Sequence, residues 1–317
     1  MDATVKPRGE NSSTFSSRRE EAQEFSCMSG TTPLTPPTNQ ACAVLMATTG
    51  RRDLLRTVSL PSVCRQSHPP TVVVLVADGC ILAPGDVREL AAIGGIEFVV
   101  LQNRRAAGAA GAWNTGLEFL AARKFDGFVA MLDDDDEWDE NHLAANLDTA
   151  RQVSANVVVS GLRLVRDGVL CERAIPRGLT DRAFLVGNPG WQGSNTFVAM
   201  HALMAVGGFR DGLASANDRD LAIRLLRSPG VRVAYTGTWT ATWHASSIRQ
   251  TLSSPGSEAK RRGLRWFWQI YGPEMTPAEA EQFFARANEL FRIGRDQILS
   301  THGDRPPHCE PRGDLLC

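Results

Sequence analysis

Two features are missing from this 317-residue sequence, and each absence excludes a class of protein. No uninterrupted apolar run approaches the ~18 residues that a membrane-spanning helix needs, since even the run from Thr71 to Val76 soon meets Asp78. Charge of one sign is not in excess either, because 34 basic residues balance 35 acidic ones. With a formal net charge of -1, no global field attracts nucleic acid or an anionic membrane. We therefore expect neither a transmembrane segment nor a nucleic-acid partner.

Paired cysteines are missing as well. The seven cysteines are scattered and odd in number, and none forms the Cys-x-x-Cys pattern of a zinc ribbon. The first 40 residues lack the apolar core of a signal peptide and carry several glutamates, which also argues against a transit peptide. A reducing cytoplasm is the expected location.

Composition divides the chain into three parts. Residues 1–40 are rich in Ser, Thr, Pro and Gly, and residues 300–317 have a similar composition, so both predict disorder. Between them, residues 41–299 predict one folded domain. We expect a nucleotide-binding half at about 41–137, an acceptor half at about 138–250 and a helical tail at about 256–299.

Short apolar runs alternate with helix-like segments in the first half of this domain. The expected strands are Ala43–Met46, Val72–Val76, Glu97–Leu101 and Gly127–Leu132, and the expected helices are Asp53–Gln66, Pro84–Ile93 and Ala109–Arg123. Continuous apolar strands separated by helices predict an α/β fold with a mostly parallel central sheet flanked by helices. Pro61 is expected to kink or split the first helix after Leu60.

The second half predicts a different arrangement. Asp167-Gly168 is a turn signal that joins strands at Asn156–Arg166 and Val169–Ile175. Further strands are expected at Thr196–Met200 and Val231–Tyr235, with a helix at Asp218–Leu226. From Glu258 onward the pattern indicates amphipathic helix, and Lys260 to Trp266 are expected to face solvent rather than bind phosphate.

Four consecutive aspartates, Asp133 to Asp136, follow an expected buried strand. Adjacent carboxylates repel one another, so a cation is expected to neutralise them, and in an extended segment alternate side chains share a side. Hard oxygen ligands suit Mg²⁺ or Mn²⁺, which complete their coordination with water and substrate phosphates. The pattern predicts a divalent-metal site, and a solvated acidic loop is the alternative.

Three other residues are candidates, each with a structural alternative. Asp78 ends a buried strand, where it could bind a nucleobase or simply form an Asp-Gly turn. Asp218 could be a general base that takes a proton from an acceptor hydroxyl, or a structural residue, either the N-cap of a helix or a first-turn acid that complements the helix dipole. His244 could contact a metal or diphosphate, or be structural.

Taken in order, these segments resemble the family 2 glycosyltransferases of the GT-A fold. The resemblance runs from about Ala43 to His244, and each piece is weak alone whereas the ordered set is strong. The matching pieces are Val44–Leu55, Val76–Gly79, Asn103–Arg105, Ala112–Gly116, Leu132–Trp138, Gly207–Phe209, Asn217–Leu221 and His244.

The resemblance implies an inverting transfer of one sugar from a nucleotide-diphosphate sugar, with a UDP-sugar as the expected donor and a hydroxyl as the acceptor. By similarity, Asp78 binds the base and Asp134 the ribose, Asp133 and Asp135 hold Mn²⁺ or Mg²⁺ with His244 nearby, and Asp218 is the base. Thr48, Thr49 and Asn114 fall in the matching nucleotide segments.

The sequence departs from the family pattern at four places. Ala77 replaces the first of two paired acids, Trp113 replaces an Arg, Thr49-Gly50 replaces Tyr-Asn, and Asn217 replaces an acid. The nucleobase contacts and the acceptor stay open. Trp191 could stack on an acceptor sugar beside Gln192, or belong to the core.

Two other functions share some of these features. A nucleotidyltransferase also holds a metal with carboxylates at strand ends, but usually has a Gly-rich loop after its first strand, and Ala47–Arg52 contains one glycine. A non-catalytic sugar-nucleotide-binding protein is the second alternative. A glycoside hydrolase, which needs two carboxylates and no metal, fits poorly.

Overall fold

The computed structural model describes residues 34, 37, 40–92, 95–171, 173–245 and 255–300, all within the compact unit Thr31–Cys317. Most of the predicted leader and the predicted tail beyond residue 300 lie outside the described residues. The account below concerns this unit alone.

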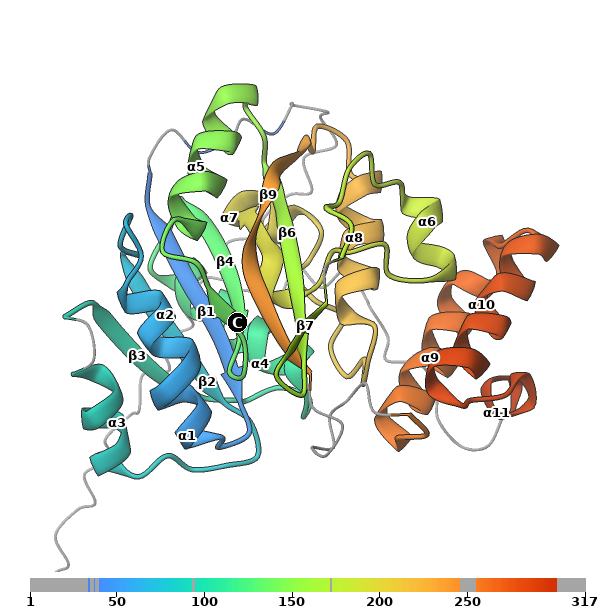
Figure 1. The fold of residues 1–317 in the computed structure, drawn as a ribbon, viewed down its shortest axis with the longest axis horizontal. Coiled ribbons are helices and arrows are strands. Elements are labelled where there is room, and N and C mark those ends of the chain that lie inside the picture. The colour runs from blue at the N-terminus through green and yellow to red at the C-terminus, as the bar shows by residue number, and fades with distance from the viewer. Residues whose placement is uncertain are drawn as a thin grey trace, which may run out of the picture. The chain divides into compact units, whose positions relative to one another are not determined.

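The described strands form one sheet in the order β3-β2-β1-β4-β8-β6-β9-β5, with β7 paired to β6 (Figure 1). Parallel pairing joins β3, β2, β1 and β4, and also β6 and β9, whereas β8 runs antiparallel to both β4 and β6. The strands are β1 (Cys42–Thr48), β2 (Val72–Ala77), β3 (Glu97–Gln102), β4 (Phe128–Asp133), β5 (Glu137–Trp138), β6 (Val157–Arg166), β7 (Val169–Cys171), β8 (Thr196–Ala199) and β9 (Val233–Ala245). The predicted α/β class and mostly parallel sheet are confirmed.

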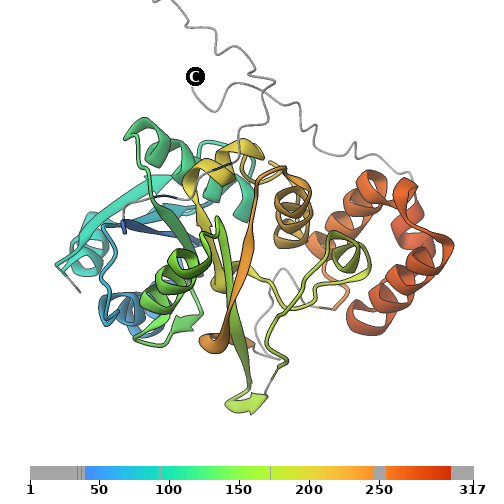
Figure 2. The same ribbon diagram turned by 90° about the horizontal axis from the view of Figure 1, so that it is seen from above.

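Helices flank the sheet, as Figure 2 shows from above. In the first half they are α1 (Arg52–Leu54), the π-helical turn η1 (Leu55–Ser59), α2 (Leu60–Cys64), α3 (Pro84–Ala91) and α4 (Ala109–Ala122). In the second half they are α5 (His142–Val153), α6 (Asp181–Val186), η2 (Gly193–Asn195), α7 (Met200–Ala205), α8 (Asn217–Arg227), α9 (Glu258–Tyr271), η3 (Gly272–Glu274), α10 (Pro277–Phe291) and α11 (Arg295–Leu299).

The first helix is not split after Leu60, as Pro61 was expected to cause, but is helical from Arg52 to Cys64 with an irregular π-helical turn before Pro61. The π-helical turn η1 ends at Ser59, so Pro61 lies in the first turn of α2, where a missing backbone N–H is tolerated.

The core lies on both faces of β1, β2 and β4, whose apolar residues are almost entirely buried. This is why these strands are continuous apolar runs rather than alternating ones. On α4, a Cβ at Gly116 would collide with Leu45 of β1, so glycine there permits close packing of helix on sheet. The packing brings the carboxyl ends of β1, β2 and β4 to one edge of the sheet.

Two predicted strands of the second half have different lengths in the structure. The strand expected at Val231–Tyr235 is β9, which continues to Ala245, and the strand expected at Val169–Ile175 ends at Cys171. The turn between β6 and β7 is confirmed, since Asp167 and Gly168 have φ values of 49° and 82°, as a two-residue hairpin turn of type I′ requires.

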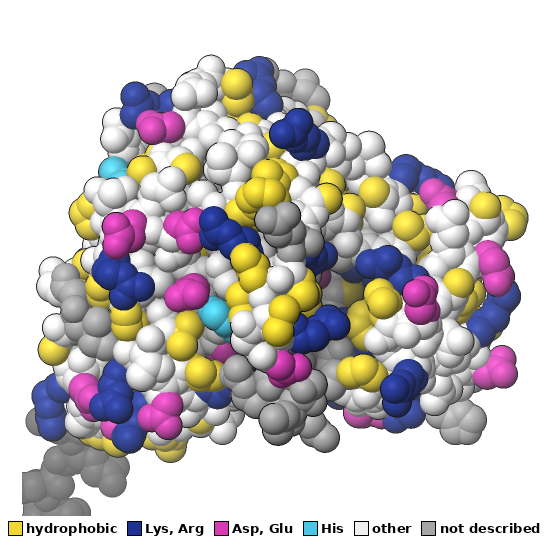
Figure 3. Space-filling view, in the orientation of Figure 1, with side chains coloured by type: hydrophobic (Ala, Val, Ile, Leu, Met, Phe, Trp, Pro, Cys, Tyr) yellow, Lys and Arg dark blue, Asp and Glu magenta, His cyan; other side chains and the backbone are white. Residues whose placement is uncertain are grey.

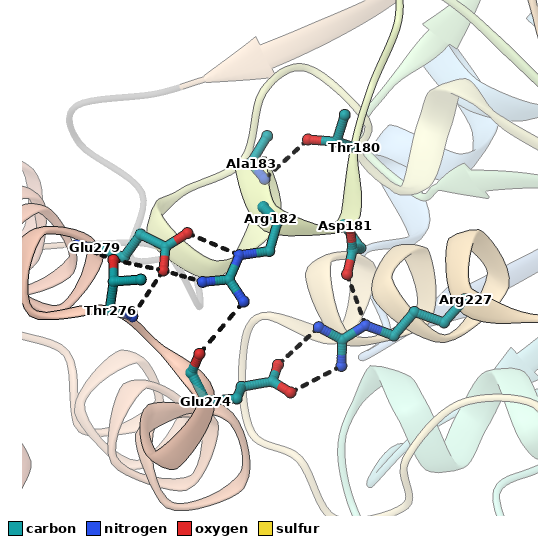
Figure 4. A network of polar contacts seen from close by, with 8 residues as sticks. All are labelled: Thr180, Asp181, Arg182, Ala183, Arg227, Glu274, Thr276 and Glu279. Atoms are coloured by element: carbon teal, nitrogen blue, oxygen red, sulfur yellow. Dashed lines mark hydrogen bonds and ion pairs between the residues drawn. The ribbon is translucent and has the colours of Figure 1, made fainter.

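The predicted helical tail is confirmed as α9, α10 and α11. Ion pairs join its segment 274–279 to α6 and α8 (Figure 4). Arg182 of α6 binds Glu279, while Arg227 of α8 binds both Asp181 and Glu274. The tail is therefore attached to the same part of the domain that carries Asp218.

Candidate active site

The four aspartates lie in a turn rather than in an extended segment. Asp133 is the last residue of β4, and its carbonyl accepts a hydrogen bond of 3.1 Å from the Asp136 N–H. The expected alternation of side chains is therefore wrong beyond Asp133. Asp134 turns toward β1, whereas Asp136 accepts hydrogen bonds from Ser194 Oγ and the His244 N–H on the opposite side of β4.

Asp134 is fully buried and bound by neighbouring side chains. Its carboxylate accepts a hydrogen bond of 2.6 Å from Thr48 Oγ1 and pairs with the Arg51 guanidinium. Burial raises the pKa of Asp134, and the positive charge of Arg51 opposes that rise. Thr48, also buried, accepts a hydrogen bond from the Gly50 N–H, so it links Asp134 to the loop after β1.

The Asp134 side chain has no exposed surface in this structure, and the ribose contact predicted for it stays a prediction. Asp134 fixes the loop that carries Thr49, and the Thr49 side chain itself is exposed.

Asp133 lies at the carboxyl end of β4, among other carboxylates. Burial, followed by the nearby charges of Asp135 and Asp134, raises the pKa of Asp133 to about 7, and Asp218 contributes in the same direction. A Cβ on Gly193 would lie 3.3 Å from Asp133 Oδ1, so only a glycine there leaves the carboxylate uncrowded. The segment 188–193 links this end of β4 to α8, since Gly193 lies against Asp133 and Asn188 donates a hydrogen bond to Asp218.

Asp218 lies in the first turn of α8, after Ala216 at the N-cap with φ 67°. Asp218 is therefore not the N-cap, but it is an acid in the first turn of α8, as the other half of the structural alternative predicted. Its carboxylate accepts hydrogen bonds from Asn188 Nδ2 at 2.7 Å and from the Arg219 N–H at 2.8 Å. Burial raises the pKa of Asp218, opposed chiefly by the charge of Lys260.

Lys260 was expected to face solvent, and that expectation is wrong. Its residue is 8% exposed, and its ammonium lies 4.4 Å from the centre of the Phe291 ring. Burial lowers the pKa of Lys260 to about 8, against the attraction of Asp218. Arg265 and Trp266 are buried as well. The amphipathic pattern of α9 does not reveal which of its charged residues are enclosed by α10 and α8.

Asp78 lies at the carboxyl end of β2, as predicted, and is partly exposed. Its two oxygens accept hydrogen bonds of 2.7 Å from Asn103 Nδ2 and 2.8 Å from the Gly108 N–H. These bonds hold the loop between β3 and α4 beside the carboxyl ends of β1, β2 and β4. A carboxylate can accept further bonds, so a base contact by Asp78 stays a prediction.

Asn114 does not face the candidate site. It is 1% exposed, its Nδ2 donates to the Phe209 carbonyl, and its Oδ1 accepts from the Phe209 N–H, both at 2.8 Å. A Cβ on Gly208 would lie 2.6 Å from Asn114 Oδ1, which explains the glycine before Phe209. The nucleotide contact predicted for Asn114 is therefore wrong, because its amide is used to hold the segment that leads to α8.

Replacing Asn114 by alanine is expected to destabilise the protein by ~1–3 kcal/mol, because the buried N–H and carbonyl of Phe209 both lose their partner. Urea unfolding of both proteins measures the loss. Thr149→Ala, which removes a partly buried helix hydroxyl bonded to the Ala145 carbonyl, is the control. An Asn114→Ala protein as stable as this control would contradict the structural role.

Trp191 belongs to the core. It is 1% exposed, its indole N–H donates to Thr196 Oγ1 at 2.8 Å, and its ring meets Phe184 edge-on. The predicted stacking on an acceptor sugar is wrong, because neither face of the ring is accessible. Gln192 is partly exposed beside Gly193, so an acceptor contact there stays a prediction.

His244 lies beside the aspartate turn, on β9. Its Nε2 is 3.0 Å from Glu137 Oε1, and its N–H binds Asp136. The ring is thus oriented by Glu137 in the structure, and a metal contact by His244 stays a prediction.

Asp133 and Asp135 are carboxylates, the ligand type that a hard divalent cation prefers, and Asp135 also pairs with Arg51. Among the described residues, no donor is hydrogen-bonded to the Asp133 carboxylate, and Asp135 lies next to it in the turn. No group of three or more His, Cys, Asp or Glu in the described part of the chain is arranged to hold a metal. Two carboxylates would suffice for an ion that completes its coordination with water and phosphate oxygens.

The mostly parallel sheet flanked by helices, with carboxylates at the ends of β2 and β4, is the architecture of the GT-A fold. The chain belongs to glycosyl transferase family 2, whose model matches residues 44–222, more than half of the sequence. It is a glycosyltransferase, which decides against the nucleotidyltransferase and non-catalytic alternatives. No curated protein matches the sequence.

Several solved structures have a similar fold. Residues 1–349 of S. aureus TarS, in complex with UDP-GlcNAc, are 17% identical, with a TM-score of 0.56 and coverage of 80% of this chain and 74% of that chain. The mannosyltransferase PcManGT from Pyrobaculum calidifontis, in complex with GDP-Man and Mn²⁺, is 18% identical, with a TM-score of 0.51 and coverage of 80% and 71%. At these identities the likeness shows the fold alone.

No helix among the described residues is both long enough and apolar enough to cross a membrane.

Proposed function

We propose that this protein transfers one sugar, with inversion, from a nucleotide-diphosphate donor to an acceptor hydroxyl. The observation that supports the proposal is that one segment, 188–193, contacts both carboxylates: Asn188 donates a hydrogen bond to Asp218, and Gly193 lies against Asp133 at the carboxyl end of β4, the edge where nucleotides bind in open α/β folds. In this proposal Asp133 serves the nucleotide-sugar donor and Asp218 serves the acceptor.

In the proposed reaction, Asp218 accepts the proton of the acceptor hydroxyl as the oxygen attacks the anomeric carbon of the donor. The bond between that carbon and the diphosphate oxygen breaks, and the nucleoside diphosphate leaves with the bonding electron pair. Asn188 Nδ2 and the Arg219 N–H orient the Asp218 carboxylate for this role. Attack from the face opposite the leaving group inverts the sugar.

Asp133 and Asp135 are the proposed ligands of Mn²⁺ or Mg²⁺. When bound, such an ion supplies a Lewis acid that neutralises the charge developing on the departing diphosphate. His244 is proposed to lie close to this ion. The Mn²⁺ in the PcManGT complex supports the choice of metal.

A UDP-sugar is the proposed donor, supported by the TarS complexes with UDP-GlcNAc and UDP. Asp78 is proposed to bind the base and Thr49 to line the nucleotide site. We also propose a cytoplasmic location, which the free thiols of Cys42, Cys64, Cys80 and Cys171 support.

Calorimetric titration with UDP, GDP, dTDP and CDP, each with and without Mn²⁺, tests this proposal. We expect one of the four nucleotides to bind, and to bind only when Mn²⁺ is present. In Asp135→Asn, we expect most of this affinity to be lost and added Mn²⁺ to make no difference. Asp148→Asn, a change of equal charge on the exposed face of α5, is expected to bind as the wild type does. The metal site is wrong if Asp135→Asn binds as tightly as the wild type.

A further inference from the structure

Arg51 lies at the end of the loop after β1, directly before α1, and its guanidinium reaches the aspartate turn. Its Nε donates to Asp134 Oδ2 at 3.2 Å, its Nη2 pairs with Asp134 Oδ1, and its Nη1 lies 2.5 Å from Asp135 Oδ2. All three nitrogens of the guanidinium therefore contact a carboxylate of the turn. The side chain is 37% exposed, so it has room to move toward solvent.

The two carboxylates that Arg51 contacts differ in their burial. Asp134 has no exposed surface and also accepts a hydrogen bond from Thr48, which does not depend on Arg51. The Asp135 side chain is 13% exposed, and its Oδ2 faces the Arg51 Nη1. The contact with Asp135 is thus the part of the arrangement that can open without disturbing the core.

We propose that Arg51 competes with the divalent cation for Asp135, so that the guanidinium must leave this carboxylate before the ion binds there. The inference rests on the proposed metal role of Asp135. Two cations in contact with one carboxylate repel each other, and this repulsion is strong in a partly buried site. While no metal is bound, the Arg51 charge therefore neutralises the carboxylates of the turn. The same charge lowers the affinity of Asp135 for the metal ion.

Arg52 provides a matched control. It is the next residue, carries the same charge, and pairs with Asp86 on the surface at 2.5 Å. Replacing either arginine by glutamine changes the net charge equally. Only the change at Arg51 removes a cation from Asp135, while the glutamine amide can still donate to Asp134.

Electron paramagnetic resonance of free Mn²⁺, without nucleotide, measures the affinity directly. We expect Arg51→Gln to bind Mn²⁺ at least about tenfold more tightly than the wild type, which corresponds to ~1.4 kcal/mol. Arg52→Gln is expected to stay within about twofold of the wild type, since its charge lies outside the turn. Adding Asp135→Asn to Arg51→Gln is expected to abolish the gain.

Equal affinities in Arg51→Gln and Arg52→Gln would overturn the inference and leave the metal site intact. If no variant binds Mn²⁺ and the wild type binds nucleotide without metal, the proposed metal site fails, and the competition fails with it. If Arg51→Gln does not fold, Arg51→Lys keeps a positive charge for the buried Asp134, but its single ammonium cannot contact Asp134 and Asp135 together as the guanidinium fork does. With the contact to Asp135 lost, Mn²⁺ is expected to raise the melting temperature of Arg51→Lys more than that of the wild type, and an equal rise would contradict the competition.

Discussion

Replacing Asp218 by asparagine is expected to lower kcat by about 10²–10⁴-fold, the usual contribution of a positioned general base. The asparagine amide cannot accept the proton of the acceptor hydroxyl. The residues at the carboxyl ends of β1, β2 and β4, where the nucleotide is proposed to bind, are unchanged. Steady-state kinetics with the donor identified by calorimetry measure kcat, and titration with its nucleotide shows that binding persists. The loss is thus expected in kcat and not in nucleotide affinity.

Local geometry predicts a secondary effect of Asp218→Asn on stability. Asn188 Oδ1 accepts from the Gly190 and Trp191 N–H groups, so its Nδ2 must point at residue 218. An asparagine at 218 can accept from Asn188 or from the Arg219 N–H, but its own NH₂ then faces the other donor. A loss of ~1–3 kcal/mol follows from the unsatisfied group.

The control for Asp218→Asn is Asp181→Asn in the first turn of α6, where the carboxylate pairs with Arg227 on the surface. It removes the same charge and is expected to keep kcat within about twofold, because surface ion pairs contribute little. Because burial raises the pKa of Asp218, the wild-type rate is expected to fall as the pH drops through that raised value. A kcat for Asp218→Asn equal to that of Asp181→Asn would falsify the role of Asp218 as the base.

Replacing Asp220 by asparagine is expected to destabilise the protein by ~3–5 kcal/mol, since it breaks a buried charge network by removing one partner. The Asp220 carboxylate has no exposed surface and binds Arg210 Nε at 2.9 Å, Arg224 Nη2 at 2.7 Å and Tyr271 Oη at 2.7 Å. Because Tyr271 belongs to α9, this one carboxylate joins α8 to the C-terminal helices. Urea unfolding at neutral pH measures the loss.

The pH dependence of this effect has a defined sign. Burial alone would raise the pKa of Asp220, but Arg224 and Arg210 outweigh it and hold the pKa below its usual value. Stability from this carboxylate is therefore complete above the unfolded pKa and is lost as the pH falls through the lower folded pKa. The difference between wild type and Asp220→Asn is expected to shrink only in strong acid.

Asp148→Asn is the control for Asp220→Asn, because its carboxylate pairs with Arg151 on the exposed face of α5. Its stability is expected to change by no more than ~0.5 kcal/mol. A similarly small change in Asp220→Asn would show that the network contributes little to joining α8 and α9.

Lys, Arg, Asp and Glu are spread over the face of the molecule that Figure 3 displays. Other charged residues are enclosed, since Asp134, Asp220, Arg219 and Lys260 are all buried. A sequence shows that a residue is charged but does not show which other elements cover it.

The strands of the first half and the position of the aspartate turn could be predicted because their signals are local. Runs such as Val72–Val76 are apolar at every position, which only a strand buried on both faces requires. Asp78 and Asp133 follow such runs directly, so the topology alone places both at the carboxyl edge of the sheet. Family resemblance added the roles proposed for them.

Other expectations failed because side-chain partners are distant in sequence. Asn114 and Phe209 are 95 residues apart, and Arg51 and Asp135 are 84 apart, so no local pattern links them. Trp191 and Gln192 are neighbours, yet one is buried and the other partly exposed. The sequence by itself determined the α/β class and the edge at which acids gather, through the period and polarity of short segments. Only the tertiary structure decided which acids face the site and which are bound within the core, because that depends on contacts between elements far apart in the chain.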